Sequence, residues 1–266
     1  MEKNLAKRTI MKSLALELLD ILDREDGSPF ADKKAAMLDA IQQKEDEQVT
    51  ELSVKAAYDE AAGRKIQDAF WQFGDTITAS SEIRLLEVCE KDREKYLDIQ
   101  REYSFTKSML KYEAYRDMVW SEFTAANTLM FSIYINDNYT GYCGIKDTGL
   151  DPWEIAIELL PEWTNKGIGT VAIPAMLKEI KNRSGVSYFR VRIDSFNYIS
   201  QHLFEKLGAV PKGISVLLLH DEKLQKECEE DNLHLIDDKL SAVAEKFGVE
   251  PRKLLSHVLE YTLLWN

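Results

Sequence analysis

Hydrophobic positions along the 266-residue chain change their spacing twice, and these changes divide the chain into three segments. Residues 1–80 place apolar side chains three or four positions apart, which is typical of amphipathic helices. Residues 81–213 mix short alternating runs with helical spacing. Residues 214–266 begin with an apolar run, Ile214–Leu219, and then show helical spacing that continues through Val258, Leu259 and Leu263. The pattern therefore predicts a helical N-terminal region, a mixed α/β domain, and a last strand with a helical C-terminal extension.

The central segment predicts a mixed sheet whose strands are joined by helical crossovers. Asn136 to Asn138 separates two alternating runs, which indicates a hairpin, and Gly208 is typical of the residue after a helix. The predicted strands are Ile83–Leu86, Met130–Ile135, Tyr139–Ile145, Trp153–Leu160 and Tyr188–Ile193. The predicted helices are one that begins at Lys91, Ile168–Ile180 and Tyr198–Leu207. We therefore expect a sheet with flanking helices.

The charge of the chain argues against two classes of partner. Lys and Arg number 34 against 46 Asp and Glu, which gives a net charge of -12. Such a balance disfavours binding to nucleic-acid phosphates and adsorption to anionic membranes. Residues 1–80 and 214–266 each carry -5, while the central segment is nearly neutral. Ala244–Leu254 faintly resembles a helix-turn-helix, but its acidic surroundings favour a hairpin for packing or homodimerisation over a DNA-binding regulator.

Three further features predict a cytoplasmic protein without a metal site. The apolar runs are much shorter than the roughly 20 residues of a membrane helix. Lys12 and Glu17 interrupt the apolar N-terminal stretch, so no signal peptide is expected. The three cysteines are widely spaced, which argues against a disulfide framework, and the four histidines lack the spacing of metal ligands.

The stretch Glu154–Thr170 is the strongest candidate for chemistry. A strand that carries two acids runs into a loop with the pattern Gly167-x-Gly169, where a helix begins. Unpaired N–H groups of the first helical turn and the helix dipole form an anion site, for which a pyrophosphate is the natural ligand. The stretch lacks the third glycine of a Rossmann fingerprint and the Gly-Lys-Ser/Thr of a Walker A loop. Taken alone, one Gly-x-Gly is also typical of a tight turn.

A second stretch, Arg190–Ala209, changes this interpretation. It contains the pattern Asn-x-x-Ser-x-x-Leu-Phe-Glu-Lys-Leu-Gly, which starts at Asn197. Together with the pattern Glu-Ile-x-Ile-x-Leu-x-Pro-Glu from Glu154 and the Gly-Ile-Gly loop, it resembles the Gcn5-related N-acetyltransferase (GNAT) family. The resemblance covers residues 82–213 and is closest to the ribosomal-protein acetyltransferase branch. It implies a GNAT-type sheet and acetyl-CoA as the co-substrate.

The resemblance also implies which residues bind acetyl-CoA. The pantetheine arm would pair like an added strand with Leu159 and Leu160. Asn197, Ser200 and Phe204 would lie along the same arm. The pyrophosphate would lie on a loop formed by Thr164, Asn165, Lys166, Gly167, Ile168, Gly169 and Thr170.

Two positions depart from the family pattern. Thr164 stands where an Arg or Gln is usual, so one phosphate donor is lost. Phe204 stands where a Tyr often protonates the leaving thiolate, and Phe has no proton to donate. Water or another group would have to fill that role.

The reaction also needs a base that takes a proton from the attacking amine. On a strand, Glu154, Ala156 and Glu158 share one face, and two carboxylates on one face would raise the pKa of one of them. Glu154 occupies the place where the family often carries its catalytic glutamate, and Glu158 lies nearer the expected thioester. Asp194 is a third candidate. The structural alternatives are a solvated or hydrogen-bonded strand acid for Glu154 and a turn or helix cap for Asp194.

These residues predict an acetyl-CoA-dependent N-acetyltransferase that acts on a primary amine of a small molecule or a protein. The acidic balance of the chain favours a cationic acceptor, such as a polyamine, an aminoglycoside-like compound or a basic protein N-terminus. The alternative is a catalytically inactive acyl-CoA-binding or scaffolding module that acts through its acidic helical flanks. In that case Thr164 and Phe204 would be signs of lost chemistry.

Overall fold

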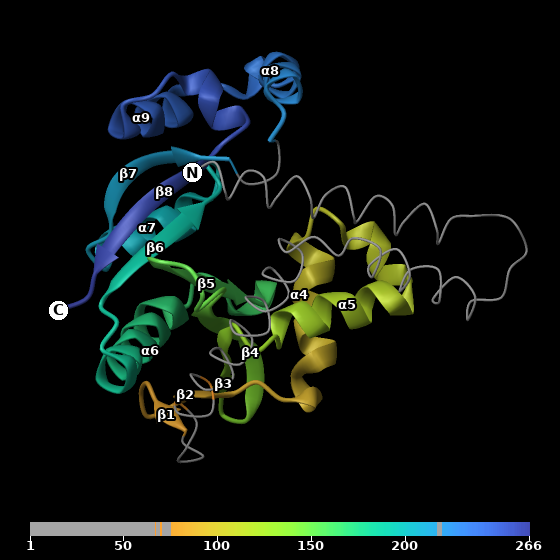
Figure 1. Ribbon diagram of the computed structural model, residues 1–266, viewed down its shortest axis with the longest axis vertical. Coiled ribbons are helices and arrows are strands. Elements are labelled where there is room, and N and C mark those ends of the chain that lie inside the picture. Colours follow the sequence, from red (N-terminus) through yellow and green to blue (C-terminus); the bar gives the residue numbers. More distant parts are fainter. Residues whose placement is uncertain (1–66, 68–69, 71–75, 217–219) are drawn as a thin grey trace, which may run out of the picture. The chain divides into compact units, whose positions relative to one another are not determined.

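The structure is a computed structural model that describes residues 67, 70, 76–216 and 220–266 (Figure 1). Most of the predicted helical region 1–80 lies outside the described residues. Within it, Ile77–Thr78 is a strand and not part of a helix, because it pairs with the strand that follows.

A mixed sheet forms the centre of the fold, as predicted. Its order is β1-β2-β3-β4-β5-β6-β8-β7, and every neighbouring pair is antiparallel except β5 and β6. The strands are β1 (Ile77–Thr78), β2 (Ile83–Glu87), β3 (Leu129–Ile135), β4 (Asn138–Ile145), β5 (Trp153–Leu159), β6 (Tyr188–Ile193), β7 (Val210–Ser215) and β8 (Val258–Leu264). The five strands predicted for the central segment are therefore confirmed, with small shifts at their ends.

Helices connect the strands and cover the sheet. The α-helices are α4 (Arg93–Tyr103), α5 (Glu113–Phe123), α6 (Ile168–Ser184), α7 (Tyr198–Lys206), α8 (Glu222–Asp231) and α9 (Asp238–Phe247). The short 3-10 helices are η1 (Glu90–Asp92), η2 (Lys107–Lys111), η3 (Pro161–Trp163), η4 (Leu233–Leu235) and η5 (Pro251–Leu255). Gly208, with φ 92°, follows the C-cap of α7 as predicted.

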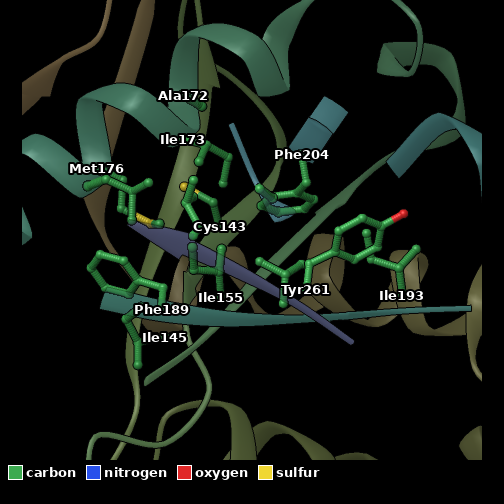
Figure 2. Close-up of a cluster of buried hydrophobic side chains, with 14 of the residues drawn as sticks. Cys143, Ile145, Ile155, Ala172, Ile173, Met176, Phe189, Ile193, Phe204 and Tyr261 are labelled. Atoms are coloured by element: carbon green, nitrogen blue, oxygen red, sulfur yellow. The ribbon is translucent and has the colours of Figure 1, made fainter. Parts of the chain in front are cut away.

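The side chains of β5 alternate between two hydrophobic clusters on opposite faces of the sheet. Ile155 packs with residues of α6, α7 and α9 in the larger cluster. Figure 2 shows this residue beside Phe189 and the α6 residues Ile173 and Met176. Ala156 packs on the opposite face, in a cluster with residues of α4 and α5. The face of β5 that carries Glu154 and Glu158 is therefore the face of α4 and α5.

The prediction of a helix through Val258, Leu259 and Leu263 is wrong, because these residues form β8. Leu259, Tyr261 and Leu263 are fully buried on one face, and the intervening residues are half-exposed. This alternation has the period of a strand, but the adjacent apolar residues Val258 and Leu259 also fit one side of a helix. The strand lies between β6 and β7 and pairs with both.

The strand predicted at Ile214–Leu219 begins earlier, at Val210, and residues 217–219 lie outside the described part. Pro211 and Gly213 disfavour a regular strand, and the register shifts between these two residues. The helices α8 and α9 are inserted between β7 and β8. The boundaries at residues 80 and 213 stay predictions, but β8 joins the segment after residue 213 to the same sheet as β6.

Candidate acetyl-CoA site

Two neighbouring parallel strands separate at the centre of the sheet. β5 and β6 pair only at Trp153 with Phe189 and at Glu154 with Arg190. Beyond Glu154, β6 continues alongside β8 while β5 continues alongside β4. The separation opens the sheet toward the end of β5.

Backbone groups of β5 face this opening. The Lys146 N–H donates to the Glu154 carbonyl at 3.0 Å, so the Glu154 carbonyl points to β4. Because backbone direction alternates along a strand, Ile157 and Leu159 point to the other edge, where β6 has moved away. These two residues offer the free edge that an extended pantetheine arm would pair with.

Leu160, predicted together with Leu159, has both of its backbone groups engaged. Its N–H donates to the Thr140 carbonyl at 2.9 Å, and its carbonyl accepts from the Trp163 N–H at 2.8 Å. The backbone groups that remain at the free edge are therefore those of Ile157 and Leu159. Ile157 was missed in the sequence because the hydrogen-bonding edge of a strand follows from its neighbour in the sheet.

The loop after β5 presents backbone N–H groups at the start of α6. Asn165 and Gly167 adopt left-handed conformations with φ 58° and 75°, which Asn tolerates and Gly adopts without strain. Gly167 is the N-cap of α6, and no side chain of the described chain caps this helix end. The first N–H groups of α6 are therefore available to an anion.

The two threonine hydroxyls of the loop are engaged by its own carbonyl groups, and Lys166 adds a positive charge. The Thr164 hydroxyl donates to the Pro161 carbonyl at 2.8 Å, and the Thr170 hydroxyl donates to the Gly167 carbonyl at 2.6 Å. Neither hydroxyl proton is free for a phosphate. The ammonium of Lys166 lies 4.8 Å from the centre of the Trp163 ring, and this cation–π contact keeps the positive charge beside the loop.

Gly169 allows close packing at this end of the site. A methyl group at this position would lie 2.8 Å from Leu203 Cδ2 and 3.2 Å from Ile157 Cδ1. The start of α6 therefore approaches both α7 and the free edge of β5. A cradle of backbone groups beside a free strand edge fits the pyrophosphate and the pantetheine arm of acetyl-CoA.

The three residues predicted on α7 differ in their surroundings. Asn197 is exposed and caps α7, since its side chain accepts from the Ser200 N–H at 3.1 Å. Ser200 is half-buried in the first turn of the helix. Phe204 is only 2% exposed and packs in the hydrophobic core near Ile193 and Tyr261 (Figure 2).

Glu154 is buried within three ion pairs. Its carboxylate lies 2.9 Å from Lys146 Nζ, 3.2 Å from Arg190 Nη2 and 2.8 Å from Arg192 Nε, and the residue is 1% exposed. Burial opposes ionisation, but Lys146 and Arg192 outweigh it and hold the pKa of Glu154 below its usual value. Glu154 is therefore a stable carboxylate with little tendency to take up a proton.

Glu158 has the opposite character. It is half-buried, and its burial raises the pKa of the carboxyl although Tyr142, Lys146 and Gln100 act in the other direction. Gln100 of α4 donates to the carboxylate at 3.3 Å, and Tyr142 is its partner across β4 and β5. The expected repulsion between Glu154 and Glu158 is not the cause of the shift, because the cations around Glu154 compensate its charge.

Gln100 and Lys146 are residues of the candidate site that sequence reasoning missed. Tyr142 lies in the predicted hairpin, and aligning that hairpin with β5 would have placed it opposite Glu158. Asp194, the third candidate base, is exposed and accepts from the Phe196 N–H at 2.8 Å. Asp194 therefore matches its structural alternative, a turn residue.

Two further side chains, Cys143 and His202, carry groups that could react. Cys143 is fully buried, which raises the pKa of its thiol, and His202 is exposed. Within residues 76–216 and 220–266, no cluster of His, Cys, Asp and Glu has the geometry of a metal site. No helix in the same ranges has both the length and the apolarity needed to cross a membrane.

Comparisons with known proteins agree with this geometry. A family model described as acetyltransferase (GNAT) domain matches residues 82–210. No curated protein sequence matches the chain. The solved structure of RimL, a ribosomal-protein alpha-N-acetyltransferase in complex with coenzyme A, superposes with a TM-score of 0.51 at 12% identity. That match covers 72% of this chain and 98% of RimL.

Two further structures are similar at lower TM-scores. The microcin C7 self-immunity acetyltransferase MccE, in complex with acetyl-CoA and AMP, gives 0.47 at 16% identity, over 70% of this chain and 94% of its own. A GNAT-family acetyltransferase from Bacillus anthracis gives 0.47 at 15% identity, over 71% and 98%. The GNAT domain uses acetyl-CoA. Residues 82–210 of this chain are an acetyltransferase domain of the GNAT family.

Proposed function

We propose that the protein is an N-acetyltransferase that transfers the acetyl group of acetyl-CoA to a primary amine. One observation carries this proposal. The free edge of β5 runs from the helix N-terminus at Gly167 toward Glu158, a half-buried carboxyl with a raised pKa. A cofactor cradle and a base thus lie along one strand.

The chain would hold acetyl-CoA with backbone groups. Amides from Asn165 to Thr170 would bind the pyrophosphate, with Lys166 as the adjacent cation. Ile157 and Leu159 would pair with the pantetheine arm, and Asn197 and Ser200 lie at the start of the helix whose Leu203 contacts the loop side of α6. When bound, acetyl-CoA supplies a thioester whose acetyl carbon an amine can attack.

Glu158 is the residue we assign as the general base. A raised pKa makes a carboxylate a better proton acceptor at neutral pH than an ordinary surface glutamate. Gln100 and Tyr142 orient its oxygens. Glu154 is assigned a positioning role, since its three ion pairs fix the point at which β5 and β6 separate.

Phe204 is left out of the proposed contacts with the cofactor, since it is buried in the core. Protonation of the departing thiolate is then assigned to water. The free cysteines of the described chain, Cys89, Cys143 and Cys228, suit a reducing compartment, so we place the protein in the cytoplasm.

The test measures CoA release from acetyl-CoA with a panel of primary amines, together with calorimetric titration by acetyl-CoA. We expect binding, amine-dependent CoA release, and loss of release in Glu158→Gln with binding retained. Glu162→Gln, which changes an exposed acid in η3, is the matched control. Binding of acetyl-CoA without CoA release for any amine would instead support a CoA-binding scaffold. Phe204, which has no proton to donate, would agree with that outcome.

A further inference from the structure

Three cations surround the single carboxylate of Glu154. Lys146, the residue after β4, and Arg190 and Arg192 on β6 each lie within 3.2 Å of its oxygens. Among the described residues, these three side chains have no other carboxylate within 4.0 Å. Glu260 is the partner of Arg192 across β6 and β8, but the two make no ion pair. We call Lys146, Arg190 and Arg192 the cationic cluster, and one carboxylate leaves it with a surplus of positive charge.

The cationic cluster has hydrogen-bond donors to spare. An ammonium carries three donors and a guanidinium five, and each cation spends one on Glu154. Arg190 Nε is buried without a partner in the described structure. The side chains of the cluster are 22% to 46% exposed, whereas that of Glu154 is 1% exposed. A ligand can therefore approach the cations although it cannot approach Glu154.

The cationic cluster lies on the same face of the sheet as the proposed base. Ile145, Ile155 and Phe189, each next in sequence to a member of this ion-pair group, fill the opposite face with core (Figure 2). Glu158 lies on the cluster's face, and the charge of Lys146 acts on its carboxyl. Glu154 and Glu158 are four residues apart on one strand, about 13 Å along it, so a small molecule can reach from one to the other.

We propose that the cationic cluster binds an anionic group of the acceptor, a carboxylate or a phosphate, and so turns its amine toward Glu158. This inference rests on the proposed function and names the class of its acceptor: an amine with a negative charge several bonds from the nitrogen. The net charge of the chain favours a cationic acceptor instead. The local surplus of positive charge determines which acceptor is preferred. Charges within a few ångströms in a partly buried site act more strongly on a ligand than distant charges that the solvent screens.

The experiment compares matched pairs of acceptors that differ in charge. Glycylglycine is paired with glycylglycinamide, and O-phosphoethanolamine is paired with ethanolamine. We expect kcat/KM to favour the anionic member of at least one pair by about tenfold or more, the size of a charge-assisted hydrogen bond. In Lys146→Gln and Arg192→Gln we expect the ratio of the two kcat/KM values within each pair to fall toward one, even where the variant also changes kcat/KM for the neutral member. Lys212→Gln, an exposed cation on β7, is the control and keeps the preference.

The ratio of the two kcat/KM values of a pair, measured with one variant, is insensitive to partial unfolding. Loss of folded protein lowers both values by the same factor. Equal kcat/KM within both pairs, or a preference that both variants retain, would overturn the inference while the proposed function stands. A preference for one pair alone supports it and identifies the group as carboxylate or phosphate. Absence of transfer to any amine would end the proposed function. The cluster is then judged by calorimetry in the presence of CoA, where equal binding of charged and neutral members would overturn the inference.

Discussion

The two ends of β5 carry the same residue type on the same face and hold it in opposite electrostatic states. At Glu154 the strand is still paired with β6, and Lys146 together with Arg192 of β6 keeps the carboxylate ionised. At Glu158 the strands have separated, and the carboxyl is half-buried beside neutral Gln100 and Tyr142. The comparison teaches that the charged and neutral neighbours of a glutamate, and not the acid itself, determine whether it stabilises the fold or exchanges a proton.

The largest expected effect belongs to Glu158. Glu158→Gln should lower kcat by about 100- to 10,000-fold, the usual contribution of a general base. Because burial raises the pKa of Glu158, its ionised form is disfavoured in the folded protein, so the variant should be as stable as the wild type at neutral pH or more stable. Steady-state kinetics and urea unfolding measure both quantities.

The pH profile sharpens the same prediction. The wild-type kcat/KM should rise with pH through a pKa above 4.5, the ordinary value, as Glu158 loses its proton. The acid limb should be absent from the residual activity of Glu158→Gln. An unchanged kcat in this variant would show that another group takes the proton of the amine.

Glu154→Gln should act mainly on stability. It leaves three cations around a neutral amide, and we expect the free energy of unfolding to fall by about 2 to 3 kcal/mol, less than for a sealed ion pair because water reaches the cations. The pKa of Glu154 is lowered on folding, so its contribution is complete above its unfolded pKa, about 4.5, and is lost as pH falls through the folded value. Urea unfolding of both proteins between pH 3 and pH 7 measures this (roughly the range of carboxyl titration). If Glu154→Gln folds with wild-type stability and has no activity, Glu154 is the base and its positioning role is wrong.

The affinity for acetyl-CoA tests the loop that follows β5. Gly167→Asp places a carboxylate at the N-terminus of α6, where it repels the pyrophosphate, and the affinity for acetyl-CoA should fall by at least about tenfold. Gly185→Asp is a close control, because Gly185 ends the same helix with φ 77° against 75° at Gly167. Calorimetric titration compares them, and equal losses of affinity would mean that strain, not charge, is responsible.

The smallest effect is expected at β8, which pairs with the edge of β6 that faces away from β5. The hydroxyl of Tyr261 donates to Glu205 of α7 at 2.8 Å, so Tyr261→Phe should cost about 1 kcal/mol of unfolding free energy with little change in kcat. Tyr188→Phe, which changes an exposed tyrosine on β6, should cost nothing measurable. A loss of kcat in Tyr261→Phe would show that the β8 side contributes to the site.

Local patterns in the sequence predicted most of the central sheet. Alternation and turn residues located the hairpin, β5 and β6, and the Gly167 loop was placed correctly at the start of a helix. What local patterns could not supply was pairing. Arg190 and Arg192 lie far from Glu154 in sequence, and only the short parallel contact of β5 and β6 brings them to its carboxylate.

The same limit explains the errors. The apolar residues of β8 fit either a strand or a helix, and only pairing with β6 and β7 selects the strand. The free edge at Ile157 and the engaged backbone of Leu160 likewise depend on which neighbour each residue faces. Long-range pairing, which a single sequence does not display, decided each of these points.

The position of β8 between β6 and β7 also sets an order of events during synthesis. When β6 and β7 have left the ribosome, the place between them is empty, and both expose unpaired edges until the residues of β8 follow. Such a distant pairing is slow to form and leaves the partial chain prone to aggregation. A nascent chain that stalls within α8 or α9 therefore offers open edges on both β6 and β7, which makes this interval the one in which a chaperone would matter most.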